Sequence, residues 1–294
     1  MRLTRIRDVI PLTGVALFLI LTFTIGCARR VEPPTPSAPA KKIAEREEAR
    51  DLRDQLISEI TAVSEKLEKS PNDIQLLKES TQLHLAYGFL MEDEDPELAK
   101  SLYTQGREYG LRALKQDQQL EEGLEAGKRI SELVANCGEE YTETLCWTGL
   151  NGGLWLLLNM NNPAILSELG DVISVVKRSI ELDDRYFYGI GKVFMGAYYA
   201  LVPAFIEPAA GPDNAVKMFQ EARSVSDGKF LLVDLFEARF LATKTNDPEL
   251  FQKRLNHVVS ADPEALKDAI LINKLSQMKA EYYLKHQGDF FLSG

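Results

Sequence analysis

The stretch RYFYGIGKVFMGAYYALVPAFIEPAAGPDNAVKMFQEARSVSDG (residues 185–228) decides the fold of this 294-residue chain. Its first half predicts a helix, because small residues recur along one side and aromatic residues fill the positions between them. Proline cannot donate a hydrogen bond to the helix ladder, so the prolines from residue 203 onward end that helix. A second helix follows, for which we expect Asp213 or Asn214 to be the cap. The stretch therefore predicts two helices that fold back on each other.

The spacing within these two helices is similar to that of a tetratricopeptide (TPR) helical hairpin. Gly196-x-x-Tyr199 matches the pattern of its first helix, and Ala215-x-x-x-Phe219-x-x-Ala222 matches the pattern of its second. The loop between the helices is several residues longer than in a standard repeat. An αα-hairpin in an ordinary helical bundle is the alternative interpretation.

The remaining sequence predicts more helices of the same kind. Ala99-x-x-x-Tyr103-x-x-Gly106 repeats the spacing of the second TPR helix. Amphipathic patterns predict further helices over residues 41–69, 74–91, 118–135, 139–159, 161–182, 230–243, 248–260 and 265–286. Strict alternation, the mark of a half-buried strand, does not occur. We expect an all-α protein of about ten to twelve helices, with TPR-like hairpins stacked into a compact, curved, right-handed solenoid or bundle. Residues 41–294 are predicted to form this single domain.

The N-terminus has the pattern of an export signal. Basic residues in MRLTRIR precede an apolar segment over residues 9–25, and Gly26-Cys27 follows. A cysteine after a small residue here resembles a bacterial lipobox. We therefore predict a signal peptide over residues 1–26, cleavage between Gly26 and Cys27, and lipid attachment at Cys27. Two or three acyl chains hold a protein firmly to a membrane. An uncleaved signal anchor is the alternative, since the apolar run is near the minimum spanning length.

Residues 27–40 contain the predicted lipidated cysteine and a proline-rich linker. The sequence RRVEPPTPSAPA (residues 29–40) favours polyproline II and forbids a helix. Ala28 follows the cysteine, and in Gram-negative lipoproteins, which this region resembles, a non-acidic residue at that position directs sorting to the outer membrane. We expect a lipid-anchored protein on the periplasmic side of the cell envelope, at the outer membrane.

Charge and motifs argue against several classes of function. The formal charge of −10 and the lack of clustered lysine and arginine argue against a nucleic-acid partner. The three histidines are His84, His257 and His286. None has a second ligand at zinc-like spacing, so we expect no metal and no other cofactor. Ser174-x-x-Lys177 and Ser276-x-x-Lys279 have the S-x-x-K spacing of penicillin-interacting enzymes. Both lie in amphipathic helices, however, and no K-T-G segment accompanies them. We predict no catalytic residue and no enzyme.

Cys137 and Cys146 are nine residues apart. On a continuous helix this spacing puts them on opposite faces and about 13 Å apart along the axis, which is too far for a disulfide. We expect free thiols.

Aromatic side chains gather in the central and C-terminal half of the chain. Most are expected to fill the core, but a subset can line an apolar groove on the concave side of the stack. Gly152-Gly153 would let a ligand or another helix approach the backbone there. The candidate groove residues are Trp147, Trp155, Tyr198, Tyr199 and Phe205.

The order of several segments resembles one protein family, the T component (TatT) of tripartite ATP-independent periplasmic (TRAP) transporters. The matching segments are residues 107–113 (REYGLRA), 146–147 (CW), 162–163 (NP), 179–191 (SIELDDRYFYGIG), 196–205 (GAYYALVPAF), 214–229 (NAVKMFQEARSVSDGK), 251–262 and 272–275 (INKL). In the loop over residues 203–215, this chain has Ala-Ala-Gly where the family has a Gly-Gly pair.

The resemblance implies a periplasmic lipoprotein of TPR-like helices that forms a homotrimer with a ligand-sized pore or cleft. It also implies a soluble solute-binding protein, the P component, as partner, and hydrophobic or amphipathic organic molecules as ligands. The expected function is a non-enzymatic transport accessory that docks the P component and passes a hydrophobic ligand. The alternative is a TPR scaffold lipoprotein for cell-envelope assembly that binds no small molecule.

Overall fold

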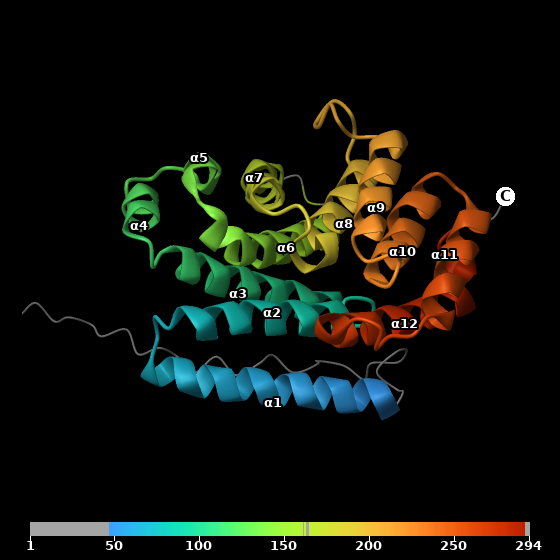
Figure 1. Ribbon diagram of the computed structural model, residues 1–294, viewed down its shortest axis with the longest axis horizontal. Helices are drawn as coiled ribbons and strands as arrows, with labels where there is room; N and C mark the ends of the chain where they lie inside the picture. Colours follow the sequence, from blue (N-terminus) through green and yellow to red (C-terminus); the bar gives the residue numbers. More distant parts are fainter. Residues whose placement is uncertain (1–46, 161, 163–164, 292–294) are drawn as a thin grey trace, which may run out of the picture. The chain divides into compact units, whose positions relative to one another are not determined.

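The computed structural model describes residues 47–160, 162 and 165–291, and these residues form helices and connecting turns without any strand (Figure 1). The helices are α1 (Glu47–Lys69), α2 (Ile74–Met91), α3 (Pro96–Leu114), α4 (Gln118–Glu125), α5 (Ile130–Leu133), α6 (Thr142–Leu158), α7 (Leu166–Leu182), α8 (Tyr186–Leu201), α9 (Pro212–Val225), α10 (Leu232–Phe236), α11 (Pro248–Ser260) and α12 (Ile270–Lys285). The all-α prediction is confirmed. The predicted signal peptide, lipid attachment site and linker lie outside the described residues.

Helices α1, α2 and α3 pack side by side (Figure 1). Asp73 caps α2, because its Oδ1 accepts hydrogen bonds from two backbone N–H groups of the first turn at 3.0 and 3.1 Å. Asp95 caps α3, which has Pro96 in its first turn. The α2 and α3 helices pack closely at Gly88, where an added Cβ would lie only 2.5 Å from the Tyr103 ring. A hairpin with Gly88 and Tyr103 in contact therefore forms where the repeat of the small-and-aromatic spacing predicts one.

Helices α8 and α9 form the predicted central hairpin. A Cβ at Gly196 would lie 2.9 Å from the Phe219 ring, so the glycine permits close contact between the two helices. The predicted cap is wrong: neither Asp213 nor Asn214 caps α9. Gly211 occupies the cap position at φ 142, a conformation that favours glycine, and Pro212 begins the helix. The missing N–H of proline needs no capping partner.

The segment between α3 and α6 differs from the prediction of one helix over residues 118–135. Helix α4 ends after two turns because Gly127 adopts a left-handed conformation at φ 79. The N–H of Lys128 then donates to the carbonyl of Gly123 at 3.0 Å, which closes the helix end. Helix α5 begins three residues after Gly127, at Ile130, and passes into a single 3₁₀ turn.

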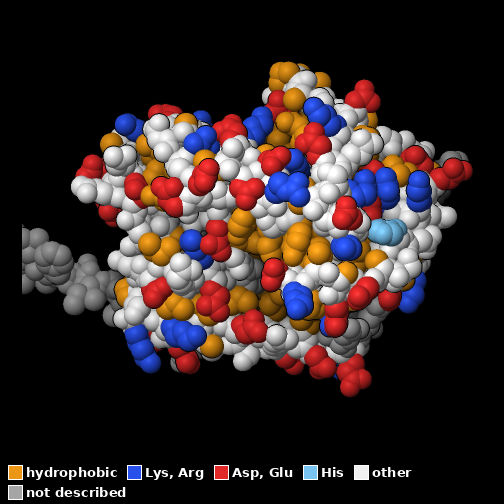
Figure 2. All heavy atoms as spheres, viewed as in Figure 1, with side chains coloured by type: hydrophobic (Ala, Val, Ile, Leu, Met, Phe, Trp, Pro, Cys, Tyr) orange, Lys and Arg blue, Asp and Glu red, His pale blue; other side chains and the backbone are white. Residues whose placement is uncertain are grey.

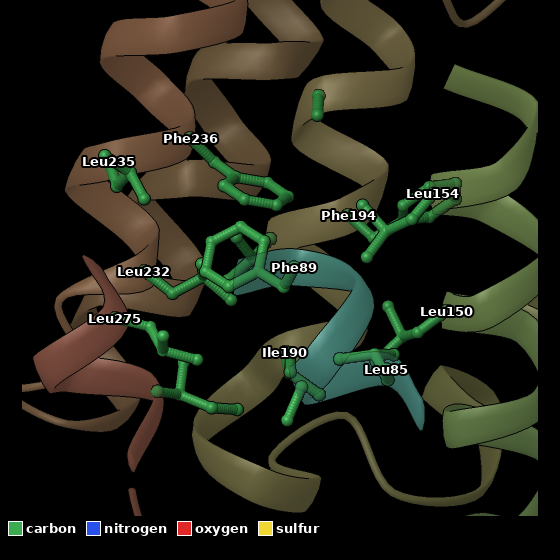
Figure 3. Packing of buried hydrophobic residues seen from close by; sticks show 14 of the residues in the cluster. Leu85, Phe89, Leu150, Leu154, Ile190, Phe194, Leu232, Leu235, Phe236 and Leu275 are labelled. Carbon is green, nitrogen blue, oxygen red and sulfur yellow. The ribbon is translucent and has the colours of Figure 1, made fainter. Parts of the chain in front are cut away.

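Helix α6 packs against α2, α3, α7 and α8. Its glycines permit this crowding: a Cβ at Gly149 would lie 2.6 Å from Val176 of α7, and one at Gly153 would lie 2.3 Å from Phe194 of α8. The glycines of α6 thus admit neighbouring helices. Figure 3 shows leucine, isoleucine and phenylalanine side chains from α2, α6, α8, α10 and α12 meeting in the core.

The C-terminal part contains α10, α11 and α12 and one irregular segment. The predicted helix over residues 230–243 is α10 followed by a π-helix, Glu237–Ala242. A π-helix inserts an extra residue per turn and so changes the direction of the side chains that follow. Within the described residues, no helix is long and apolar enough to span a bilayer. The right-handed curvature of the stack and the boundary at residue 41 stay predictions.

Candidate functional site

The first turn of α8 is left-handed. Phe187, Tyr188 and Gly189 have φ values of 41°, 59° and 75°. Bulky residues rarely adopt this conformation, which persists only when the surroundings hold it in place. Gly189 lies against α9, where an added Cβ would be 3.4 Å from the Cα of Ala222. Regular helix begins only after this turn, which the small-and-aromatic pattern of the sequence does not indicate.

Aromatic contacts hold the left-handed turn. The indole Nε1 of Trp147 donates a hydrogen bond to the Tyr186 hydroxyl at 3.0 Å, and the Trp147 and Phe187 ring centroids are 4.9 Å apart. Phe230 lies 5.8 Å from Phe187 and 5.7 Å from Tyr188, again between centroids. We call these five residues the aromatic cluster. Trp147 and Phe230 are buried, whereas Tyr186, Phe187 and Tyr188 are half-buried. The cluster therefore has a solvent-facing edge.

Figure 2 shows apolar side chains gathered in a hollow in the middle of one face, over α6 and the start of α8. A contiguous apolar area on a solvent-exposed surface marks a candidate binding surface.

An open cavity of about 480 Å³ adjoins the aromatic cluster and shares Tyr186 with it. Its walls are mainly acidic, and we call it the acidic pocket. It is lined by Glu139, Glu140, Thr142, Glu143, Leu182, Asp183 and Tyr186. Glu143 accepts hydrogen bonds from Lys78 at 2.8 Å and from Gln82 at 3.2 Å. Among the described residues, the other three carboxylates make no ion pair.

Two further features of the acidic pocket bear on its chemistry. Burial raises the pKa of Tyr186, and the Glu143 carboxylate raises it further, so the phenol stays protonated at neutral pH. The Thr142 hydroxyl is buried and has no hydrogen-bond partner among the described residues. Carboxylates beside an aromatic ring attract an ammonium or guanidinium group through charge and through the ring face. The pocket can therefore receive cationic side chains.

An enclosed apolar cavity lies deeper in the molecule, between α2, α6, α8, α10 and α12 (Figure 3). Its residues include Phe89, Leu154, Phe194 and Phe236. The free volume is only about 20 Å³, the space of a single water molecule. In this conformation it is a small packing gap in the core, and an organic solute does not fit inside.

The five residues predicted to line a groove lie in different surroundings. Trp147 belongs to the aromatic cluster, and Trp155 is partly buried near the end of α6. Tyr198 is buried in a stack with Phe194 and also contacts Tyr199. Phe205 is exposed in the loop between α8 and α9. A groove lined by all five stays a prediction.

A buried ionic core, which the sequence analysis did not find, joins the α2–α3 turn to the C-terminal helices. Lys279 of α12 lies 3.1 Å from Glu92 and also pairs with Asp93, and Arg239 of the π-helix pairs with the same two carboxylates. The Tyr283 hydroxyl donates to Asp93. Burial alone would raise the pKa of Asp93, but Lys279 and Arg239 outweigh it and hold that pKa at about 2. We call these five residues the ionic core.

A second ionic group lies where α9, α10, the π-helix and α11 meet. Arg223 pairs with the buried carboxylates of Asp234 and Glu237, and Arg254 contacts both from α11. The His257 Nδ1 lies 2.6 Å from Asp234 Oδ2. Every charge here has an opposite partner, and the group links α9, α10, the π-helix and α11.

The two predicted free thiols are confirmed. Cys137 and Cys146 are both buried and unbridged. Burial raises the pKa of both thiols, that of Cys146 to about 12. Over the part of the chain that the structure describes, no group of three or more histidine, cysteine or carboxylate side chains has an arrangement that could hold a metal ion.

Comparison with known proteins identifies the family. A family model described as "TRAP transporter T-component" matches residues 56–291. The chain belongs to this family. The match covers most of the chain and confirms the resemblance that the order of its segments indicates. T-components are transport accessories associated with the other components of a TRAP transporter.

This T-component is also similar to an uncharacterized protein of Treponema pallidum (strain Nichols). The two are 22% identical over 209 residues, which is 69% of this chain and 64% of that protein. This chain therefore spans less than two thirds of the relative's length.

Proposed function

We propose that this T-component is a lipid-anchored accessory of a TRAP transport system that docks a soluble solute-binding P component in the periplasm. Acyl chains on Cys27 would tether it to the envelope, at the outer membrane, and the linker up to residue 40 would let the domain reach its partner. The acidic pocket and the exposed edge of the aromatic cluster would form the docking surface.

The observation that carries this proposal is the juxtaposition of two complementary surfaces at Tyr186. Its ring belongs to the solvent-facing edge of the aromatic cluster and also lines the acidic pocket. Interfaces of proteins that associate and separate commonly combine aromatic anchors with a charged rim. Because Glu139, Glu140 and Asp183 make no ion pair among the described residues, they can pair with lysine or arginine of a partner. Charge complementarity of this kind accelerates association and selects the partner.

Co-purification tests the proposal. The acylated full chain, extracted in detergent, should retain a solute-binding protein encoded in the same genome, and raised salt should weaken the complex. Genes for that protein and a membrane permease beside the gene of this chain would agree with the same role. Recovery of an outer-membrane assembly protein in place of a solute-binding protein would favour the scaffold function and contradict the transport function.

A hydrophobic organic ligand, if carried, would bind at the exposed edge of the aromatic cluster, because the enclosed cavity of about 20 Å³ is too small for it. Native mass spectrometry of the chain purified from cells tests this: it should retain an apolar small molecule that a Tyr188→Ser variant loses. A homotrimer is part of the same proposal, and light scattering of the detergent-solubilised chain measures its mass.

A further inference from the structure

The loop between α8 and α9 presents an apolar tip to solvent. Phe205 is 87% exposed and Ile206 is 37% exposed. Among the large apolar residues of the described ranges, Phe205 has the highest exposed fraction. The loop projects beyond the ends of both helices, and apolar side chains mark the same place in the space-filling view (Figures 1 and 2).

Hydrogen bonds define the conformation of this loop. The N–H of Ile206 donates to the Pro203 carbonyl at 2.9 Å, and the N–H of Ala210 donates to the Glu207 carbonyl at 2.8 Å. At the base, the N–H of Gly211 donates to the Tyr199 carbonyl of α8 at 2.8 Å. The tip is therefore held out from the body on two hydrogen-bonded turns.

Only one residue of the loop sequence VPAFIEPAAGP (residues 202–212) carries a charge, and it is turned inward. The Glu207 carboxylate accepts hydrogen bonds from Lys177 of α7 at 2.8 Å and from the Ala209 N–H at 3.3 Å. Its side chain is only 15% exposed. The bond from Lys177 lowers the pKa of Glu207, so the pair stays ionised and mutually neutralised. The outward surface of the tip is consequently apolar and uncharged.

A protruding apolar loop without net charge on its outward surface can insert into a lipid bilayer. Aromatic and aliphatic side chains on a polar body enter the boundary between lipid headgroups and acyl chains. A bilayer is close at hand if the chain is anchored at Cys27. The roughly 20 residues from Cys27 to Glu47 span at most about 70 Å when extended.

We propose that Phe205 and Ile206 enter the lipid interface and form a second membrane contact, which orients the anchored domain on the bilayer surface. The inference rests on the lipid anchor of the proposed function. With the front of the chain and this loop both at the membrane, the domain has a fixed face toward the periplasmic partner.

Quenching by brominated lipid tests the proposal. The acylated full chain carrying Phe205→Trp would be reconstituted into vesicles of phosphatidylethanolamine and phosphatidylglycerol with brominated acyl chains. Ile74→Trp is the matched control, because Ile74 is an apolar residue, 43% exposed, at the start of α2. The unsubstituted chain gives the background of Trp147 and Trp155. Mass spectrometry of the same preparation reports acylation of Cys27.

We expect bromine to quench the indole at position 205 severalfold more than the indole at position 74. Equal or no quenching in a chain that is acylated and bound to vesicles would overturn the inference and leave the anchor intact. A chain that is neither acylated nor bound would overturn both. A blue-shifted emission at position 205 that depends on protein concentration and ignores bromine would show that a second copy covers the tip, and would also overturn it.

Discussion

Replacement of Lys279 by methionine removes one cation from the buried ionic core. The Lys279 side chain is 2% exposed and lies between Glu92 and Asp93, while Arg239 contacts the same carboxylates from the π-helix. Methionine has nearly the same volume, so the packing around the Phe89 ring, 4.6 Å from the ammonium nitrogen, is largely kept. The main change is that two largely buried carboxylates then share one cation.

The loss of stability follows from the burial. Removing one partner of a buried ion pair costs about 3–5 kcal/mol, because the remaining charge is desolvated without compensation. In a domain of this size, 1 kcal/mol corresponds to roughly 2–4 °C in melting temperature, so the Lys279→Met variant should melt about 6–20 °C lower. Lys100→Met is the matched control: Lys100 pairs with the exposed Glu97 one turn away, and loss of such a pair costs about 0.2–1 kcal/mol.

The assay is thermal and urea unfolding of the protein, each followed by helical circular dichroism. The effect should depend on pH in a definite direction. Because the folded pKa of Asp93, about 2, is below its ordinary value of 3.8, its stabilising contribution is present above pH 4 and is lost as pH falls toward 2. The difference between the Lys279→Met variant and the unsubstituted chain should therefore shrink over that window. A Lys279→Met variant no less stable than Lys100→Met at pH 7 would refute this explanation of the ionic core.

Three further outcomes are expected. Gly153→Ala should lower the free energy of unfolding by about 1–3 kcal/mol in the same urea assay, because its Cβ would lie 2.3 Å from the Phe194 ring; an unchanged midpoint would contradict the tight α6–α8 contact. Burial lowers the pKa of His84 from its ordinary value of 6.5 to about 4. As pH falls from 6.5 toward 4, the unfolded chain therefore takes up a proton that the folded chain does not, and the free energy of unfolding decreases; His84→Phe should flatten the stability profile in this window. Cys146 should resist a thiol reagent at pH 8 until urea unfolds the chain, because burial raises its pKa to about 12; labelling of Cys146 at the rate of a free thiol in the native chain would show that the site opens.

The sequence predicts the helices well where local signals agree with packing. The limits of α2 and α11 coincide with those predicted, because Asp73 and Asp247 cap them and their apolar residues keep helical spacing. The prediction fails at residues 118–135, where the amphipathic pattern continues across Gly127 but the chain turns there. The sequence also does not predict the left-handed start of α8. Tertiary contacts impose a positive φ on bulky residues there, and no local sequence pattern signals that conformation.

The candidate site could be predicted only in part. Trp147 was expected to line an apolar groove, which stays a prediction; it is buried and contacts Phe187 of the left-handed turn. The acidic pocket brings Glu139 together with Asp183, residues more than 40 positions apart in the sequence, and only the packing of α6 against α7 makes them neighbours. The ionic core could not be predicted for the same reason. In the sequence, Glu92 and Asp93 belong to a solvated acidic turn, and only the fold brings Lys279, nearly 190 residues later, into contact with them.

A binding titration tests the central claim most directly. The unsubstituted chain would be titrated with the solute-binding protein of the same genome, and compared with Glu139→Lys/Glu140→Lys. A control, Glu68→Lys/Glu79→Lys, makes the same charge change at exposed positions of α1 and α2. We predict saturable binding that the pocket variant weakens at least about tenfold, which is about 1.4 kcal/mol, and that the control leaves within about twofold. No binding to the solute-binding protein, or equal weakening by both variants, would contradict docking at the acidic pocket.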